Sequence, residues 1–118
     1  MNVEEYRSYC LSKEAVAESF PFDGETLVFK VAGKIFALAN VDLFSSINLK
    51  CDPERAVELR ELFDGAIVPG YHMNKRHWNT ITVDGRVGDK LLFELIDHSY
   101  FLIVKSLPKK IRQKYQLD

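Results

Sequence analysis

The chain has 118 residues, of which 47% are hydrophobic and 28% are charged, and its formal net charge is −1. A chain of this length forms one domain and buries enough apolar surface to fold without metals or disulfides. No stretch reaches the roughly 18 apolar residues of a membrane-spanning helix, which excludes a membrane span. The acidic start, Met1 to Glu5, lacks a signal-peptide pattern, so we expect a cytoplasmic protein with reduced thiols at Cys10 and Cys51.

Charge is distributed unevenly along the sequence. Residues 1–68 hold seven Lys/Arg and twelve Asp/Glu, a net charge of −5. Residues 69–118 hold nine Lys/Arg and five Asp/Glu, a net charge of +4. Such an asymmetry can mark a surface for a polyanion, and it also arises by chance on solvated surfaces, so both interpretations stay open.

The first predicted element is a helix over residues 3–12. Asn2 and Glu5 have the spacing of a capping box, and apolar residues follow at helical intervals. Residues 13–18 have only a weak pattern. Residues 20–22, Phe-Pro-Phe, are expected to pack a connection onto the core, because proline resists both helix and central strand.

Three strands are predicted next. Residues 27–32 and 34–39 are two β-rich runs that meet at Gly33, whose positive φ suits a tight hairpin. Residues 44–50 form the third strand, in which Ile47 and Leu49 face inward because side chains alternate along a strand. The short connections favour an antiparallel meander.

The second half of the chain predicts two more helices. Asp52 and Pro53 have the residue types of an N-cap and a first helical position, so a helix is expected over residues 53–63. A short strand over residues 66–68 ends at Pro69-Gly70, and another strand covers residues 77–83.

Residues 89–106 show the apolar spacing of a long helix. A helix is therefore expected over this range, either unbroken or in two pieces with a break near His98-Ser99, and Pro108 is expected to stop it. The complete order predicts an α+β fold, an antiparallel sheet with helices packed on one face.

The most concentrated motif of the chain is residues 69–79. Its polar and aromatic members are Tyr71, His72, Asn74, Lys75, Arg76, His77, Trp78 and Asn79. Cations interleaved with aromatic rings suit a nucleic acid or another anion, because cations meet phosphates and rings stack on bases. The structural alternative also stands. Trp78 would anchor the core with its indole N–H on a carbonyl, and Asn74 would adopt the left-handed conformation in a turn.

Other lysines could extend such a surface. The run from Lys105 to Lys114 holds five cations and no acid, which is typical of a polyanion surface or of a solvated tail. We include Lys109 and Lys110 in the candidate nucleic-acid or anion site. Lys50, at the end of the third strand, is included as well, with edge protection as its alternative.

Enzymatic and metal sites are weakly indicated. The sequence has no phosphate-binding glycine loop and no Gly-x-Ser-x-Gly or His-Glu-x-x-His motif. His72 or His77 would be the general base of a small enzyme, but nothing identifies a nucleophile. Their spacing of five fits neither a helix face nor a strand face. We therefore expect no catalytic residue, no metal and no cofactor.

Six segments of the chain resemble one known family. They are residues 19–22, 31–36, 49–54, 69–79, 99–100 and 107–110, in family order. On these segments the chain is identified as a member of the MmcQ/YjbR family, and the Asn-Lys-x-His-Trp core at 74–78 is the most specific of them. The resemblance implies a two-layer sandwich like that of the frataxin homologue CyaY. It also implies a DNA-binding protein, with the family signature falling on Asn74, Lys75, His77 and Trp78.

The leading hypothesis is a non-enzymatic, monomeric binding module that contacts DNA or another nucleic acid through the 69–79 segment. Lys75, Arg76 and the tail lysines would neutralise phosphates with help from Lys50, and Trp78 or Tyr71, if exposed, would stack on bases. The alternatives are a domain that binds a protein partner or a small anion and, less favoured, a small enzyme. No membrane contact is expected.

Overall fold

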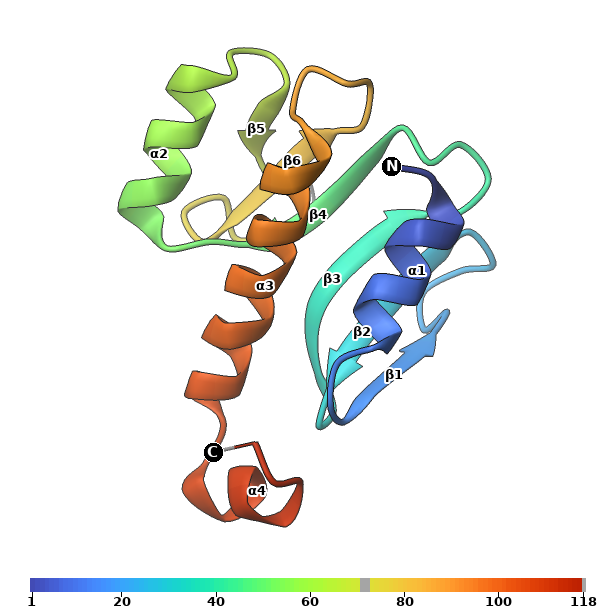
Figure 1. Ribbon diagram of the computed structural model, residues 1–118, viewed down its shortest axis with the longest axis vertical. Coiled ribbons are helices and arrows are strands. Elements are labelled where there is room, and N and C mark those ends of the chain that lie inside the picture. The colour runs from blue at the N-terminus through green and yellow to red at the C-terminus, as the bar shows by residue number, and fades with distance from the viewer. Residues whose placement is uncertain (71–72, 118) are drawn as a thin grey trace.

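The computed structural model describes residues 1–70 and 73–117 (Figure 1). The helices are α1 (Val3–Leu11), α2 (Pro53–Leu62), α3 (Asp89–Ser106) and α4 (Lys109–Lys114). The strands are β1 (Val16–Ser19), β2 (Thr26–Val31), β3 (Lys34–Asn40), β4 (Ser46–Lys50), β5 (Ile67–Pro69) and β6 (Trp78–Thr82). All neighbouring strands pair antiparallel in the order β1-β2-β3-β4-β6-β5. The predicted α+β class is confirmed.

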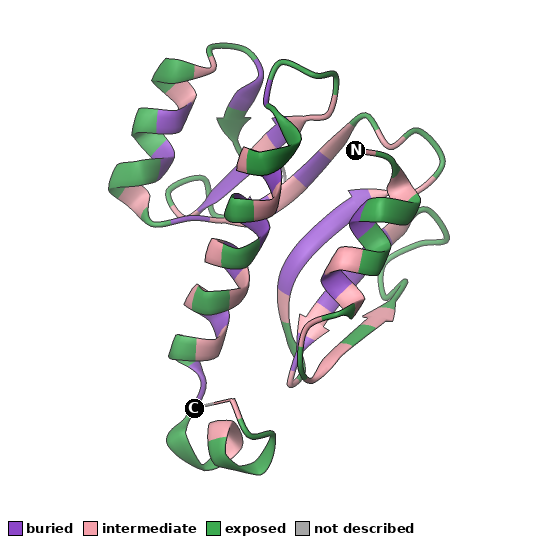
Figure 2. Ribbon diagram, viewed as in Figure 1, coloured by how far each residue is buried: buried purple, intermediate pink, exposed green. Residues whose placement is uncertain are grey.

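The main core lies between the helices and one face of the sheet. It joins Tyr6 and Cys10 of α1, Ala56 and Leu59 of α2 and the buried stripe of α3 to the inward side chains of the strands. Figure 2 shows these buried residues in purple where helices and strands meet, and exposed residues on the outer sides of α2 and α4. Within the described residues, no helix is long and apolar enough to cross a membrane.

None of the described helices covers the opposite face of the sheet, which is called the open face below. Val28, Leu38 and Trp78 form a small second apolar cluster there, with Ile35 and Met73 packed against it. In β4 the burial alternates as predicted. Ile47 and Leu49 point into the main core, and the residues between them point to the open face.

Local sequence signals position several element ends as predicted. The Asn2 side chain accepts a hydrogen bond from the Glu5 N–H at 2.8 Å, and the Glu5 carboxylate accepts one from the Asn2 N–H, which completes the capping box of α1. Asp52 accepts from the Arg55 N–H at the start of α2. Gly33 has φ +87° in the β2–β3 turn.

Some predicted boundaries were wrong. The weakly patterned residues before Phe20 contain β1, an edge strand held by its pairing with β2. The third strand starts only at Ser46, because Phe44 has φ +40° and belongs to a turn. Pro69 is part of β5 and does not break it, which is possible because β5 is an edge strand and proline there leaves no donor unpaired.

The last long helix has no break near His98-Ser99. α3 is continuous over 18 residues, from Asp89 to Ser106. Ser99 favours a break in the sequence because a serine hydroxyl can compete for backbone hydrogen bonds. Here its hydroxyl bonds two strands of the sheet, so the helix continues unbroken. Pro108 ends α3 as predicted, and the basic run after it forms the short helix α4.

Candidate functional site

Trp78 is a structural anchor of the open face. It pairs with Lys50 across β6 and β4, and its side chain is only 8% exposed in the cluster with Val28 and Leu38. A buried indole is not available to stack on a base, so Trp78 does not meet the condition of exposure on which the stacking prediction rests. The expected bond from its N–H to a carbonyl is also missing, because among the described residues the indole N–H has no hydrogen-bond partner.

The backbone approaches Trp78 closely at Gly70. The Gly70 N–H donates to the Trp78 carbonyl at 2.7 Å. A Cβ on Gly70 would lie 2.7 Å from the Trp78 Cβ, closer than side chains normally come. Gly70 is therefore required at this position by packing, and Pro69-Gly70 serves the architecture of the segment.

Arg60 of α2 holds the segment from the other side. Its Nε donates to Asn79 Oδ1 at 2.7 Å, and its Nη2 donates to the carbonyls of Lys75 and Trp78. Asn79 itself is 2% exposed. Sequence reasoning missed Arg60, since a single arginine on the polar side of a helix carries no pattern that points to a distant loop.

Asn74 closes a tight turn with its side chain. Its Oδ1 accepts from the Arg76 N–H at 2.9 Å, and its carbonyl accepts from the N–H groups of His77 and Trp78. Asn74 is not among the residues with positive φ, so the predicted left-handed conformation is wrong. The side-chain bond stabilises the turn instead.

Of the remaining predicted site residues in this segment, Lys75 and Arg76 have exposed side chains and His77 is half-buried. Neither Lys75 nor Arg76 forms an ion pair with another described residue. Tyr71 and His72 lie outside the described residues. The segment therefore combines a buried scaffold, Trp78 and Asn79, with two exposed cations.

The strand register places several cations of the chain at one end of the sheet. At this end, called the hairpin end below, β2 turns into β3, β4 finishes and β6 begins. The exposed or half-exposed cations there are Lys30, Lys34, Lys50, Lys75 and Arg76. α3 runs to the same end, where Lys34 Nζ contacts Ser106 Oγ at 3.5 Å. It thereby places α4 close to the β2–β3 turn (Figure 1).

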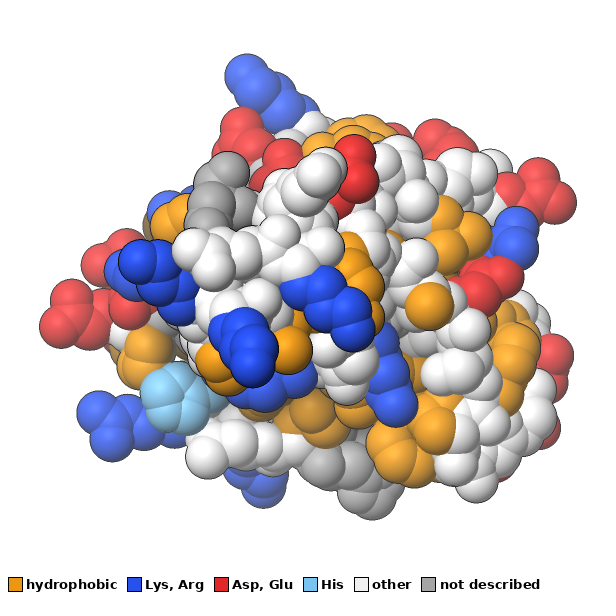
Figure 3. Space-filling view, turned by 90° about the horizontal axis from the view of Figure 1, so that it is seen from below, with side chains coloured by type: hydrophobic (Ala, Val, Ile, Leu, Met, Phe, Trp, Pro, Cys, Tyr) orange, Lys and Arg blue, Asp and Glu red, His pale blue; other side chains and the backbone are white. Residues whose placement is uncertain are grey.

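α4 adds the largest group of charges to the hairpin end. Lys105 at the end of α3 and Lys109, Lys110 and Lys114 of α4 are all exposed, and none of them is ion-paired within the described residues. Figure 3 views the molecule from this side and shows Lys and Arg gathered in the middle, with Asp and Glu mostly toward the margins. The start of α2, which follows β4 at this end, contributes the acids Asp52 and Glu54.

Candidate nucleophiles and metal ligands are poorly placed. Burial raises the pKa of Cys10 to about 12 and that of Cys51 to about 11, so both stay protonated thiols near neutral pH. No group of three His, Cys, Asp or Glu in the described part of the chain could hold a metal ion. The His77 side chain has no hydrogen bond to a serine, cysteine or carboxylate among these residues.

His98 has a structural partner. Its Nε2 accepts a hydrogen bond from the Asp52 N–H at 3.2 Å, which joins the middle of α3 to the start of α2. Burial, reinforced by the nearby Arg55 charge, lowers the pKa of His98, and Asp52 opposes this. The neutral imidazole is thus the form compatible with this contact, because only a neutral imidazole has a ring nitrogen that can accept the hydrogen bond from the Asp52 N–H.

The fold and this surface define a small α+β domain with an open antiparallel sheet and a basic end. Residues 11–102 match the family model described as YjbR. YjbR of Escherichia coli (strain K12), an uncharacterized protein, is 32% identical over 96% of both chains. YbdF of Escherichia coli O157:H7, also uncharacterized, is 38% identical over 80% of this chain and 78% of its own. The chain belongs to the YjbR family, as its motifs indicated.

Solved structures support the same assignment. The crystal structure of the Deinococcus radiodurans protein DR2400, with a DUF419 domain, matches 98% of this chain and 88% of its own. Its TM-score is 0.94 and its sequence identity 42%. A Pseudomonas syringae crystal structure matches 86% of this chain and 98% of its own, with a TM-score of 0.72 and 29% identity. The antiparallel sandwich is therefore the common fold of these proteins.

Proposed function

We propose that this protein is a non-enzymatic module that binds nucleic acid through the hairpin end. One observation carries the proposal. Exposed cations from the β2–β3 turn, the 73–77 loop and α4 converge on the same end without acidic partners among the described residues. A cluster of exposed lysines without ion-pair partners among the described residues attracts a polyanion and releases its counterions on contact.

The proposed contacts are to phosphates and not to bases. Trp78, one of the two rings expected to stack, is buried, and the exposed groups named at the hairpin end are lysines and Arg76, which suit phosphates. Lys109 and Lys110 are central because they are exposed and lie on a short helix that projects from the domain. Binding of this kind depends little on the base sequence of the nucleic acid and strongly on the salt concentration.

The test uses fluorescence anisotropy with labelled single-stranded and duplex DNA over a range of salt concentrations. We expect micromolar binding at about 50 mM salt that weakens steeply toward about 200 mM. Lys109→Ala with Lys110→Ala should weaken binding about tenfold. The slope of log Kd against log salt should fall by about 0.9 for each phosphate that the variant no longer neutralises.

The matched control is Arg86→Ala with Lys90→Ala. It removes the same charge from the opposite end of the molecule, in the loop before α3 and its first turn (Figure 1). We expect this pair to leave affinity and slope nearly unchanged, with circular dichroism verifying the fold of both variants. No binding at the lowest salt, or equal effects of the two pairs, would overturn the proposal.

A further inference from the structure

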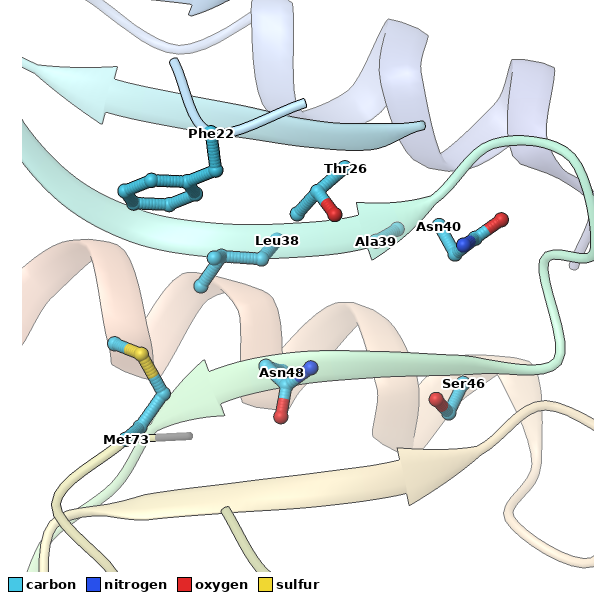
Figure 4. A pocket seen from close by; sticks show the side chains of 8 residues that line it. All are labelled: Phe22, Thr26, Leu38, Ala39, Asn40, Ser46, Asn48 and Met73. Atoms are coloured by element: carbon cyan, nitrogen blue, oxygen red, sulfur yellow. The ribbon is translucent and has the colours of Figure 1, made fainter. Parts of the chain in front are cut away.

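The open face of the sheet carries a pocket of about 400 Å³. Figure 4 shows Leu38 at its floor between two side chains from loops, Phe22 before β2 and Met73 before β6. Asn40, Asn48, Thr26 and Ser46 line the rest. A concave, mostly apolar space of this size with a few polar groups is typical of small-molecule sites.

The two amides of the pocket offer hydrogen-bond donors to a ligand. Asn40 Oδ1 accepts from the N–H groups of Asp42 and Leu43 at 3.0 and 3.1 Å, and Asn48 Oδ1 accepts from Thr80 Oγ1 at 2.5 Å. Both amide oxygens are therefore occupied within the protein. Their NH₂ groups have no partner among the described residues, and Figure 4 shows the Asn48 oxygen turned toward β6 and its nitrogen turned away from it.

The described part of the lining carries no charge. Its eight described residues are apolar, amide or hydroxyl residues, so no lysine, arginine or carboxylate among them could balance an ionic ligand. Phe22 is 66% exposed, which leaves a large apolar ring beside the pocket without a covering group. A ring in the pocket would cover it and would contact the Met73 thioether, which packs favourably on aromatic edges.

We propose that this pocket binds a small, neutral, planar molecule that presents hydrogen-bond acceptors, of the class of aromatic or heteroaromatic carbonyl compounds. The ring lies over Leu38 between Phe22 and Met73. Its acceptor atoms accept hydrogen bonds from the side-chain NH₂ groups of Asn40 and Asn48. The site lies on the open face and does not depend on nucleic-acid binding at the hairpin end.

The experiment is an NMR titration of the full chain with coumarin, a neutral two-ring probe that has a carbonyl acceptor. The side-chain NH₂ signals of Asn40 and Asn48 report the pocket directly. We expect them to shift saturably with a dissociation constant on the order of 1 mM, because an unoptimised ligand of this size gains little per atom. Indole, a two-ring probe with a donor and no acceptor, should bind at least about fivefold more weakly.

Phe22→Ala and Phe101→Ala provide the matched pair. Both remove an exposed phenylalanine, but Phe101 lies on α3, away from the open face. We expect Phe22→Ala to raise the coumarin dissociation constant about threefold or more and Phe101→Ala to leave it unchanged, since only Phe22 covers apolar surface of the bound ring. Absence of saturable shifts at the two amides, equal binding of indole, or equal effects of the two variants would overturn the assignment.

Discussion

Ser99 shows how one hydroxyl connects three elements. The paired residues of β3 and β4 extend from Ala39 opposite Ile47 to Ala37 opposite Leu49, where the pairing ends. Just beyond this point the Lys50 N–H donates to Ser99 Oγ at 2.9 Å, and the Ser99 hydroxyl donates to the Phe36 carbonyl at 2.5 Å. The fully buried hydroxyl thereby supplies hydrogen-bond partners to two backbone groups that the pairing of β3 and β4 does not satisfy.

Replacing Ser99 by Ala should therefore destabilise the protein. The change leaves one backbone donor and one acceptor unsatisfied in a buried place, at a cost of about 1–3 kcal/mol in the free energy of unfolding. Urea denaturation measures it. Ser106→Ala is the matched control on the same helix. The Ser106 hydroxyl donates to the Ile103 carbonyl of its own helix and accepts from the exposed Lys34 ammonium at 3.5 Å, so its loss leaves no buried group unsatisfied and we expect a change below about 0.5 kcal/mol. Similar stabilities of the two variants would contradict the bridging role.

Single residues were predictable where their role was local. The capping box at Asn2, the N-cap Asp52 and the positive φ of Gly33 follow from contacts within four residues, and all are confirmed. Trp78 and Arg60 were not predictable. Because side chains alternate along a strand, the sequence predicts that Trp78 and Asn79 lie on opposite faces of the sheet, but it does not predict which face the helices cover. Arg60 forms hydrogen bonds with residues 15 to 19 positions away, a distance that no local pattern reveals.

Contacts between elements decide how the helices are held against each other and the sheet. α2 reaches α3 through the bond from the Asp52 N–H to His98 Nε2, which requires the imidazole to be neutral. The pKa of His98 is lowered in the fold, whereas in the unfolded chain it should lie at about 6.5. Between these two values the unfolded state binds more protons, so stability rises with pH across this window.

We expect the free energy of unfolding to fall as the pH drops from about 6.5 through the folded-state pKa of His98. His98→Gln removes the titrating group and keeps an oxygen that can accept from the Asp52 N–H. This variant should lose the part of the pH dependence that His98 causes, as measured by urea denaturation at several pH values. His77→Gln is the control and should retain it. An identical pH profile in wild type and His98→Gln would refute the linkage.

Elements with strong periodicity were predicted and weakly patterned ones were not. α3 has an apolar stripe over 18 residues, so its extent was predicted correctly, and of the two alternatives the unbroken helix is the one that forms, with Ser99 bonded to the sheet. β1 is four residues long with little burial contrast, and only its pairing with β2 makes it a strand. Strand pairing of this kind is a tertiary property that propensity does not encode.

At the scale of the whole molecule, the antiparallel topology separates charge. Turns alternate between the two ends of the sheet, so residues far apart in sequence collect at the hairpin end. The excess of cations after residue 68 lies at one end of the folded domain, because the basic end of α3 reaches Lys34. Polarity of this kind steers a polyanion toward one end.

This polarity extends the proposed footprint beyond α4. Lys34→Ala on the β2–β3 turn and Lys75→Ala on the 73–77 loop should each lower DNA affinity and reduce the salt slope by up to about 0.9. Lys90→Ala, on the first turn of α3, should change neither quantity. Anisotropy titrations at several salt concentrations measure all three. Unchanged slopes for Lys34→Ala and Lys75→Ala together would confine the contact to α4 and contradict a footprint across the sheet end.

The sequence by itself determined the helix caps, the hairpin, the main elements, the α+β class and the family, because these depend on residues within a turn of one another or on an ordered set of motifs. Only the tertiary structure decided that Trp78 is buried and that Ser99 bridges two strands. It also gathered Lys34 and α4 at one end and formed a pocket between Phe22 and Met73. Each of these depends on strand register and on contacts across tens of residues, which local pattern does not specify.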